Sequence, residues 1–243
     1  MENKVAIVTG ASRGIGAAIA KKLASLGATV IVNYAGSREK AETVVKEIEN
    51  AGGKATAMQC DISDFNKCSE FTNEVKDRFG SIDILVNNAG ITRDNLLMKM
   101  SEEDFDAVIQ TNLKGVFNCT RHIARQMLKQ KSGRIINISS MWGTVGASCE
   151  VAYSATKSGL NGLTRALAKE LAPSNIQVNA IACGVIDTVM NDLLDAEEKA
   201  ALAEEIPAGR FGTPEEVALL AWQLANAPAY LTGQILGMDG GYI

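Results

Sequence analysis

The amino-acid sequence predicts an α/β protein with a three-layer, doubly wound Rossmann fold, built on a seven-stranded and mostly parallel sheet. Three observations favour this class of fold. Short apolar runs rich in β-branched residues alternate with longer segments of helical periodicity along the whole chain. These runs lack polar alternation, as strands buried on both faces do. A glycine-rich turn follows the first of them, as in folds that bind dinucleotides.

The predicted strands are short runs bounded by turn residues. They cover residues 5–8, 29–32, 55–58, 82–86, 134–138, 176–181 and 235–238. Helical periodicity predicts crossover helices over residues 14–26, 38–51, 66–79, 112–131, 153–171 and 214–226. Right-handed crossovers of this kind place helices on both faces of the sheet.

One dinucleotide-binding catalytic domain is expected over residues 1–243, because no low-complexity linker or proline-, glycine- and serine-rich hinge divides the chain. The longest connection covers residues 186–212, contains a helical-looking segment rich in alanine and glutamate over residues 193–205, and ends in Pro207, Gly209 and Gly212. Connections longer than about 12 residues in compact domains are often functional. We therefore expect a substrate lid around residues 186–212.

Charge and composition exclude several classes of function. The chain has 24 basic and 28 acidic residues without a basic stripe, so nucleic acid is not an expected partner. Five cysteines without a Cys-x-x-Cys pair, and the single histidine His122, predict neither a disulfide framework nor a metal site. No stretch approaches the ~20 apolar residues of a membrane span, and we expect a cytoplasmic protein.

The turn after the first predicted strand resembles a phosphate cradle. Residues 9–16 read Thr-Gly-Ala-Ser-Arg-Gly-Ile-Gly and lead into a predicted helix, whose N-terminus offers free N–H groups to a pyrophosphate. A structural turn can mimic such a glycine triplet, and the strand-turn-helix context favours the cradle. The cofactor contacts expected here are Gly10, Ser12, Arg13, Gly14, Ile15 and Gly16.

The end of the second predicted strand bears on the choice of cofactor. NAD-selective folds usually carry an acidic residue there, whereas this chain has Asn33 and Tyr34, which we expect to contact the cofactor. Arg13, with Arg38 as a second candidate, is suited to hold a 2′-phosphate, although a loop arginine is often only solvated surface. The sequence therefore favours NADP(H) over NAD(H).

Two residues after the third predicted strand, Asp61 and Ile62, are placed to flank an adenine. For the neighbouring Ser63 or Asp64, the alternative role is the N-cap of the helix that follows.

Tyr153 and Lys157 lie four residues apart at the start of a predicted helix, and therefore on one face of it. A free tyrosine has a pKa of ~10, and a nearby lysine cation is expected to lower it by stabilising the phenolate. Tyr153 then becomes a usable acid. Taken alone, such a pair more often marks an exposed helical face.

Together these segments resemble the short-chain dehydrogenase/reductase family, through residues 9–16 and 87–90, Asn112, Ser140 thirteen residues before Tyr153, and Lys157. The similarity covers nearly the whole chain, including residues 230–234 and 239–241. Within that family, residues 32–36, 90–94 and 162–164 are most similar to the bacterial β-ketoacyl-acyl-carrier-protein reductases.

The resemblance implies a role for each of four catalytic residues. Tyr153 would protonate the carbonyl oxygen as hydride arrives from the nicotinamide, and Ser140 would hydrogen-bond that oxygen. Lys157 would lower the pKa of Tyr153 and hold the nicotinamide ribose. Asn112 would hold a water that links Lys157 to solvent, with a satisfied core amide as the alternative.

The resemblance also implies further cofactor contacts. Asn88, Ala89 and Gly90 would line the adenosine ribose, and Gly184, Ile186 and Thr188 would lie beside the nicotinamide. One departure is Cys183, where the family usually has proline. We expect Cys183 to be a small buried hydrophobe, with a redox-sensitive thiol as the alternative.

The function implied is the NADPH-dependent reduction of a 3-oxoacyl thioester to the (3R)-hydroxyacyl product in fatty acid biosynthesis. The alternatives are reduction of another ketone, a sugar, a steroid-like alcohol or an acyl-CoA, and a catalytically idle dinucleotide-binding scaffold. An acyl carrier protein is a possible partner, with Lys129, Lys131 and Arg165 as candidate contacts and Ser174 where an arginine is expected. The resemblance implies a homotetramer, with a dimer as the alternative, formed through the helices over residues 112–131 and 153–171 and through the C-terminal strand, which would bury Met127, Leu128 and Leu160.

Overall fold

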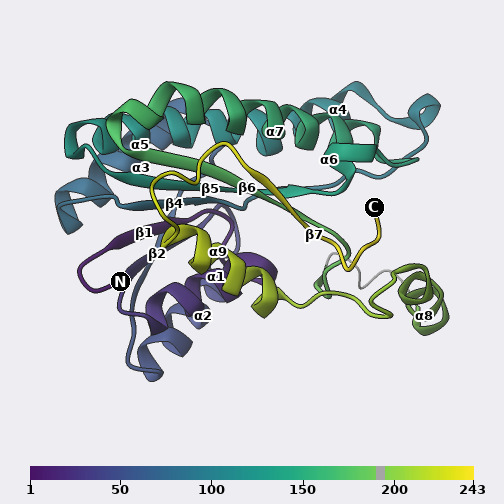
Figure 1. Ribbon diagram of the computed structural model, residues 1–243, viewed down its shortest axis with the longest axis horizontal. Helices are drawn as coiled ribbons and strands as arrows, with labels where there is room; N and C mark the ends of the chain where they lie inside the picture. The colour runs from purple at the N-terminus through teal and green to yellow at the C-terminus, as the bar shows by residue number, and fades with distance from the viewer. Residues whose placement is uncertain (190–194) are drawn as a thin grey trace.

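The computed structural model describes residues 1–189 and 195–243, which form a seven-stranded sheet of order β3-β2-β1-β4-β5-β6-β7 (Figure 1). Every pairing between neighbouring strands is parallel. The strands are β1 Val5–Val8, β2 Thr29–Tyr34, β3 Lys54–Gln59, β4 Ile84–Asn87, β5 Gly133–Ser140, β6 Ile176–Cys183 and β7 Ile235–Met238. The predicted doubly wound fold is confirmed.

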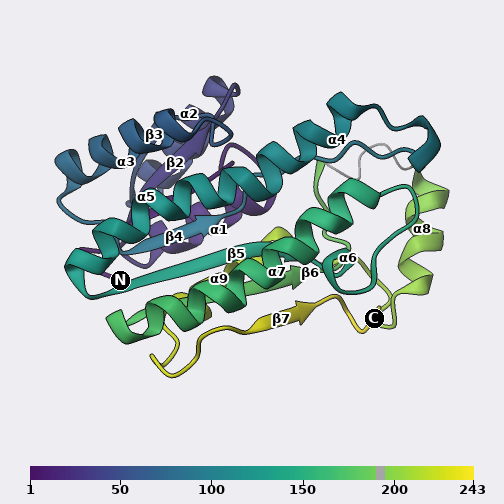
Figure 2. The ribbon, with the colours of Figure 1, turned by 90° about the horizontal axis from the view of Figure 1, so that it is seen from above.

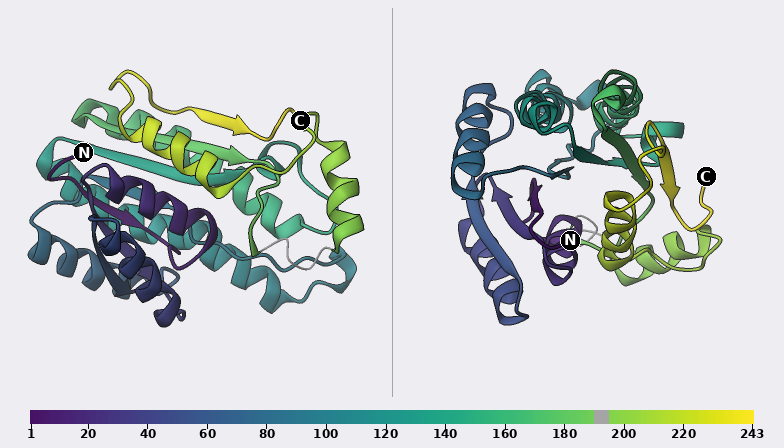
Figure 3. Two further views of the ribbon diagram at one scale, coloured as in Figure 1. Left: turned by 90° about the horizontal axis from the view of Figure 1, so that it is seen from below. Right: turned by 60° about the vertical axis from the view of Figure 1, so that its left-hand side comes forward.

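Helices cover both faces of this sheet (Figures 1 and 3). On one face lie α1 Gly14–Ser25, α2 Arg38–Asn50 and α9 Pro214–Ala225. On the other face lie α3 Phe65–Phe79, α5 Gly115–Gln130 and α7 Val151–Leu171. At one end of the sheet are α4 Glu102–Ile109, α6 Trp142–Val145 and α8 Ala196–Glu205.

Two hydrophobic cores fill the space between the sheet and its helices. Along β1, Ala6 and Val8 belong to the core beneath α1, α2 and α9, whereas Val5 and Ile7 belong to the core beneath α3, α5 and α7. Burying a valine or isoleucine side chain contributes about 1.5–3 kcal/mol. Strands that are apolar on both faces are therefore what this three-layer arrangement requires.

Three helical segments differ from the sequence prediction. The predicted helix over residues 112–131 begins at Gly115, and Asn112 lies before it in a π-helical turn, Gln110–Lys114. The short helices α4 and α6 were not predicted, because neither is long enough to show a clear apolar period.

The predicted lid lies partly outside the described residues, since residues 190–194 are not among them. Its described part contains α8 and a parallel bridge between Ile186 and Gly212. Within residues 1–189 and 195–243, no helix is both long and apolar enough to span a membrane.

Candidate active site

The glycine-rich turn lies at the carboxyl end of β1, next to β4, where the order of the strands reverses and open α/β sheets bind their ligands. Gly10 has φ +62°, and a Cβ there would lie 2.8 Å from the Cα of Ala89. A Cβ on Gly16 would lie 2.6 Å from the carbonyl oxygen of Gly10. The turn therefore requires glycine, and it presents the N-terminus of α1 as a cradle that fits a dinucleotide phosphate.

Asn88 and Thr9 fasten this turn to the end of β4. The backbone N–H groups of Asn88 and Ala89 donate to Thr9 Oγ1 at 2.9 and 3.1 Å. The Asn88 side chain donates to the carbonyl oxygens of Thr9 at 2.9 Å and Gly10 at 3.2 Å. The predicted cofactor segments around Gly10 and Asn88 are thus brought together as one unit.

Asn33 and Tyr34 support the cradle from the interior. Asn33 is only 1% exposed; its Nδ2 donates to the carbonyl oxygen of Cys60 at 3.0 Å, and its Oδ1 accepts from the N–H of Gly10 at 3.3 Å. Tyr34 is buried in the core beside α2. Asn33 thus uses its side chain for bonds within the chain and Tyr34 packs in the core, and their contact with the cofactor stays a prediction.

The two arginines considered for a 2′-phosphate have different surroundings. Arg38 Nε lies 2.7 Å from Glu42 Oε1, one turn along α2. Arg13 lines a groove of about 380 Å³ together with Ser12 and Lys40. Within the described part of the chain, neither Arg13 nor Lys40 has a recorded ion pair, so they are the cations open to a phosphate beside the glycine turn.

After β3, the structure shows which residue is the N-cap of α3 and where Asp61 and Ile62 lie. The Asp64 side chain accepts bonds from the N–H groups of Asn66 and Lys67, so Asp64 is the N-cap of α3. Asp61 Oδ1 accepts a hydrogen bond from the Ser63 hydroxyl at 2.7 Å. Asp61 is exposed just after the end of β3. Ile62 is buried.

Ser140, Tyr153 and Lys157 converge at the carboxyl end of β5. Ser140 is the last residue of that strand, and its Oγ accepts from the N–H of Trp142 at 3.2 Å. Tyr153 and Lys157 lie on the first turns of α7, and Lys157 Nζ is 5.3 Å from the centroid of the Tyr153 ring. Lys157 is 4% exposed and donates to the carbonyl oxygen of Ile138 at 2.7 Å.

Burial has the largest effect on the pKa values of Tyr153 and Lys157. It raises the pKa of Tyr153, with the charges of Cys183 and Glu150 adding to the increase and the hydrogen bond of Ser140 opposing it. Burial also lowers the pKa of Lys157 to about 8. Overall the pKa of Tyr153 is raised, where the sequence analysis expected it to be lowered, because burial penalises the phenolate more than the neighbouring groups stabilise it.

Asn112 is buried between three segments of the chain. Its amide exchanges two hydrogen bonds with the backbone of Ile91, which follows the predicted ribose segment ending at Gly90. Its Nδ2 also lies 3.5 Å from Thr156 Oγ1 on α7. The alternative of a satisfied core amide therefore describes its bonding, and Asn112 connects the cofactor segment to the helix that carries Tyr153.

The segment after β6 lies against the glycine turn. A Cβ on Gly184 would lie 2.6 Å from the Cα of Asp239, so glycine is required there as well. Thr188 Cγ2 is 3.6 Å from where a Cβ on Gly14 would sit, which places Thr188 over the glycine turn. Ile186 is buried, and burial raises the pKa of the Cys183 thiol to about 12. A protonated, buried thiol agrees with the expected role of Cys183 as a small hydrophobe.

Sequence reasoning gave too little weight to three residues near this site. The charges of Asp94 and Glu150 raise the pKa of Tyr153, and the backbone N–H of Asn95 donates to the carbonyl oxygen of Cys149 at 2.9 Å, which joins their two loops. Tyr242, next to the last residue, contacts Trp142. The spacing of Glu150, three residues before Tyr153, was the available signal, whereas the contact of Tyr242 has none. In the described segments, no group of three or more acidic, cysteine or histidine side chains is arranged to hold a metal.

Comparisons with known proteins agree with this geometry. The family model described as short chain dehydrogenase matches residues 4–199. The 3-oxoacyl-acyl-carrier-protein reductase FabG of Staphylococcus aureus is 50% identical over 98% of this chain and 97% of its own. That of Thermotoga maritima is 46% identical over 100% and 99%. A crystal structure described as a short-chain alcohol dehydrogenase from Sinorhizobium meliloti superposes with a TM-score of 0.94 at 39% identity, covering 100% of this chain and 97% of its own.

The fold and the site define an oxidoreductase that uses a nicotinamide dinucleotide. The chain belongs to the short-chain dehydrogenase family.

Proposed function

We propose that the protein is an NADPH-dependent reductase that converts a 3-oxoacyl thioester, linked to acyl carrier protein, to the (3R)-hydroxyacyl product in fatty acid biosynthesis. The observation that carries this proposal is the convergence of Ser140, Tyr153 and Lys157 at the end of β5. The substrate class is supported by relatives named 3-oxoacyl-acyl-carrier-protein reductase, which are 46–50% identical over nearly the whole chain.

In this mechanism the protein positions a carbonyl and supplies its proton. A bound NADPH supplies the hydride that adds to the carbonyl carbon. The Ser140 hydroxyl donates a hydrogen bond to the carbonyl oxygen, and the Tyr153 phenol gives that oxygen a proton, so the product is an alcohol. Burial keeps Tyr153 protonated at neutral pH, because it raises the phenol's pKa. The Lys157 ammonium then stabilises the phenolate until solvent returns a proton.

The preference for NADPH follows from the charges beside the glycine turn. Arg13 is suited to bind a 2′-phosphate, and Lys40 lines the same groove. No acidic side chain ends β2, where it would bind a 2′-hydroxyl and repel a phosphate.

Lys129 and Lys131, which the sequence analysis named as carrier contacts, lie far from the active site of their own chain. Lys129 and Lys131 lie just before the start of β5 at Gly133, whereas Ser140 ends that strand. A strand of eight residues spans about 25 Å, so these lysines lie at the opposite end of the sheet. On the active-site end, Lys99 is an exposed cation, and Arg93 is exposed with its Nε 3.4 Å from Asp104 Oδ1; we propose both as contacts for an acidic carrier.

We propose a homotetramer, using the outer faces of α5 and α7. Met127 and Leu160 are buried within the chain itself, so they are not available to an interface as the sequence analysis expected. Phe117 and Leu128, on α5, are 47% and 41% exposed and support this face as a contact between copies.

The test follows NADPH absorbance with an acetoacetyl thioester on carrier protein and on coenzyme A, for the wild type and Tyr153→Phe. We expect turnover that prefers the carrier, is lost in Tyr153→Phe and is much slower with NADH. Binding of NADPH without thioester turnover would contradict the proposal. Turnover of a simple ketone or secondary alcohol instead would favour the activity suggested by the Sinorhizobium relative's description.

A further inference from the structure

The end of the chain folds back onto helix α8 and the loop that follows it. Figures 2 and 3 show the C-terminus beside α8, at the end of the sheet where β5 and β6 finish. The backbone N–H of Ala208 donates to the carbonyl oxygen of Gly240 at 3.0 Å. Gly240 has φ +69°, and a Cβ there would lie 2.8 Å from Ile206 Cγ2. The tail therefore packs closely against the chain just past α8.

Tyr242 makes two side-chain contacts from this tail. Its hydroxyl donates to Glu205 Oε2, on the last residue of α8, at 2.6 Å. Its ring packs edge-on against the Trp142 indole, with centroids 6.1 Å apart and planes at 61°. A short hydrogen bond to a carboxylate is among the stronger kinds, and the edge-on geometry is favourable for two aromatic rings.

Trp142 connects this contact to the candidate active site. Its backbone N–H donates to Ser140 Oγ, and it is the first residue of α6. The contacts therefore run from Ser140 through Trp142 and Tyr242 to Glu205. These residues come from β5, α6, the C-terminal tail and α8, which are far apart in the sequence and meet at one end of the sheet.

We propose that Tyr242 is a positioning residue for the substrate: its hydroxyl fixes α8, and its ring fixes the Trp142 indole beside Ser140. This inference rests on the proposed function, because Trp142 bears on a substrate only if Ser140 binds the carbonyl. Tyr242 touches neither the glycine turn nor α1 among its recorded contacts, so binding of the dinucleotide should not depend on it.

Three variants test the hydroxyl contact and the ring contact of Tyr242 separately. Tyr242→Phe removes the hydroxyl bond and keeps the ring, Glu205→Gln weakens the same bond from the other side, and Tyr242→Leu removes both contacts. Tyr230→Phe is the matched control, because Tyr230 is fully exposed and has no recorded hydrogen bond in the described chain. A Trp222→Phe background leaves Trp142 as the single tryptophan, since the sequence has 2.

Three measurements are made on each full-length variant: KM and kcat for the acetoacetyl thioester, the Kd for NADPH, and trypsin cleavage after Lys199 in α8. We expect Tyr242→Phe and Glu205→Gln to raise KM roughly tenfold, consistent with loss of one charge-assisted bond, with kcat and Kd little changed. Both variants should also be cleaved faster in α8. Their double variant should be no worse than either one, because they break the same bond.

Fluorescence of Trp142 gives a readout that does not depend on turnover. Its emission should shift in Tyr242→Leu and stay unchanged in Tyr242→Phe and Tyr230→Phe. Emission and cleavage in Tyr242→Leu equal to those of the wild type would overturn the proposal, as would a rise in KM that Tyr230→Phe reproduces. If the wild type reduces no thioester, the proposed function fails by itself, while fluorescence and cleavage still decide whether Tyr242 holds α8 and Trp142.

Discussion

Asn112 and Ile91 close a ring of two hydrogen bonds. The N–H of Ile91 donates to Asn112 Oδ1 at 2.8 Å, and Asn112 Nδ2 donates to the carbonyl oxygen of Ile91 at 2.8 Å. The amide thus pairs with the backbone as a neighbouring strand would. It fixes the loop after β4 to the π-helical turn before α5, and this turn faces Thr156 on α7.

Replacing Asn112 should therefore cost both stability and activity. Asn112→Ala leaves two backbone groups of Ile91 without partners, which costs about 1–3 kcal/mol in the free energy of unfolding. It also frees the loop at Gly90, so we expect kcat to fall. Urea denaturation and NADPH oxidation measure the two effects.

Asn118→Ala is the matched control for this prediction. Asn118 is equally buried on α5, but it donates to the carbonyl oxygens of Ile62 and Ser63, away from Tyr153. It should lose similar stability with kcat nearly unchanged. Equal losses of kcat in the two variants would show that Asn112 acts through stability alone.

Asn112 also shows what the sequence can and cannot predict. Periodicity and composition report how a segment packs against the sheet, so they located the strands and the long helices correctly. They predicted Asn112 inside a regular helix, because neither the π-helical turn nor the bond of Asn112 to the distant Ile91 leaves a signal in the local periodicity. The inward direction of Asn33 likewise depends on its bond to Cys60, and the contact between Trp142 and the C-terminal tail is non-local too.

The choice of cofactor should depend on Arg13 and not on Arg38. Arg13→Ala removes a cation beside the glycine turn, and we expect the Kd for NADPH to rise roughly tenfold while that for NADH stays constant. Arg38 is an exposed residue paired with Glu42, so Arg38→Ala should change neither constant appreciably. Titration of NADPH fluorescence measures both. A larger loss in Arg38→Ala than in Arg13→Ala would assign the phosphate to α2.

The buried Lys157 should make stability depend on pH. Burial lowers its pKa from 10.5 to about 8, so the charged form is penalised in the folded protein. Its contribution to stability is fully present above pH 10.5 and is lost as the pH falls through about 8. In Lys157→Met this dependence is absent, so the variant should gain on the order of 3 kcal/mol relative to wild type between pH 10.5 and pH 7.

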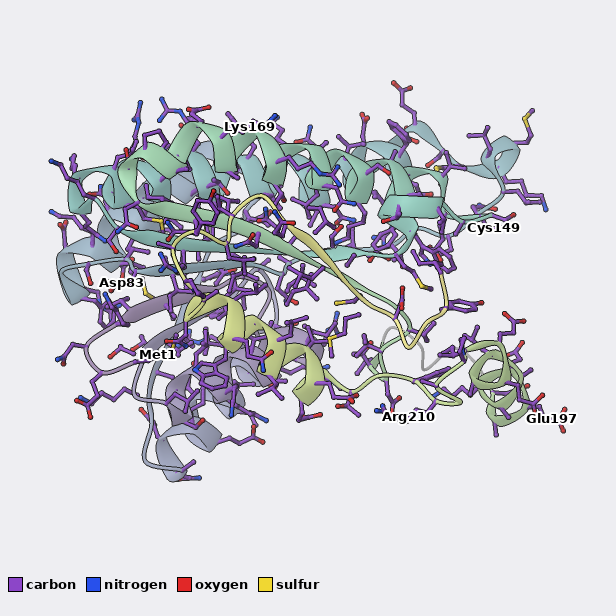
Figure 4. All side chains as sticks on the ribbon, viewed as in Figure 1. Met1, Asp83, Cys149, Lys169, Glu197 and Arg210 are labelled. Carbon is purple, nitrogen blue, oxygen red and sulfur yellow. The ribbon has the colours of Figure 1, made fainter. Side chains whose placement is uncertain are left out.

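Urea denaturation at several pH values measures this gain. Lys169→Met is the control, because Lys169 is exposed further along the same helix (Figure 4). If the difference in free energy of unfolding between wild type and Lys157→Met does not change between pH 7 and pH 10, the Lys157 ammonium is well solvated or paired in the folded state.

Glu150 should contribute a second pH dependence, of opposite sign. Burial, and then the charge of Asp94, raises the pKa of Glu150 from 4.5 to about 7. The folded protein thus favours the neutral carboxyl, and this contribution to stability is present below pH 4.5 and lost as the pH rises through about 7. Glu150→Gln cannot ionise, so it should match the wild type at acidic pH and exceed it in stability at pH 8.

The same substitution should move the pH profile of the reaction. The ionised Glu150 raises the pKa of Tyr153, so Glu150→Gln should lower that pKa and shift the alkaline limb of kcat/KM to lower pH. Glu170→Gln, which removes an exposed carboxylate at the far end of α7, should leave the profile in place. An alkaline limb shifted equally in both variants, or in neither, would show that Glu150 does not act on the phenol. A shift confined to Glu150→Gln would show that the loop over residues 147–150 helps to set the pKa of Tyr153.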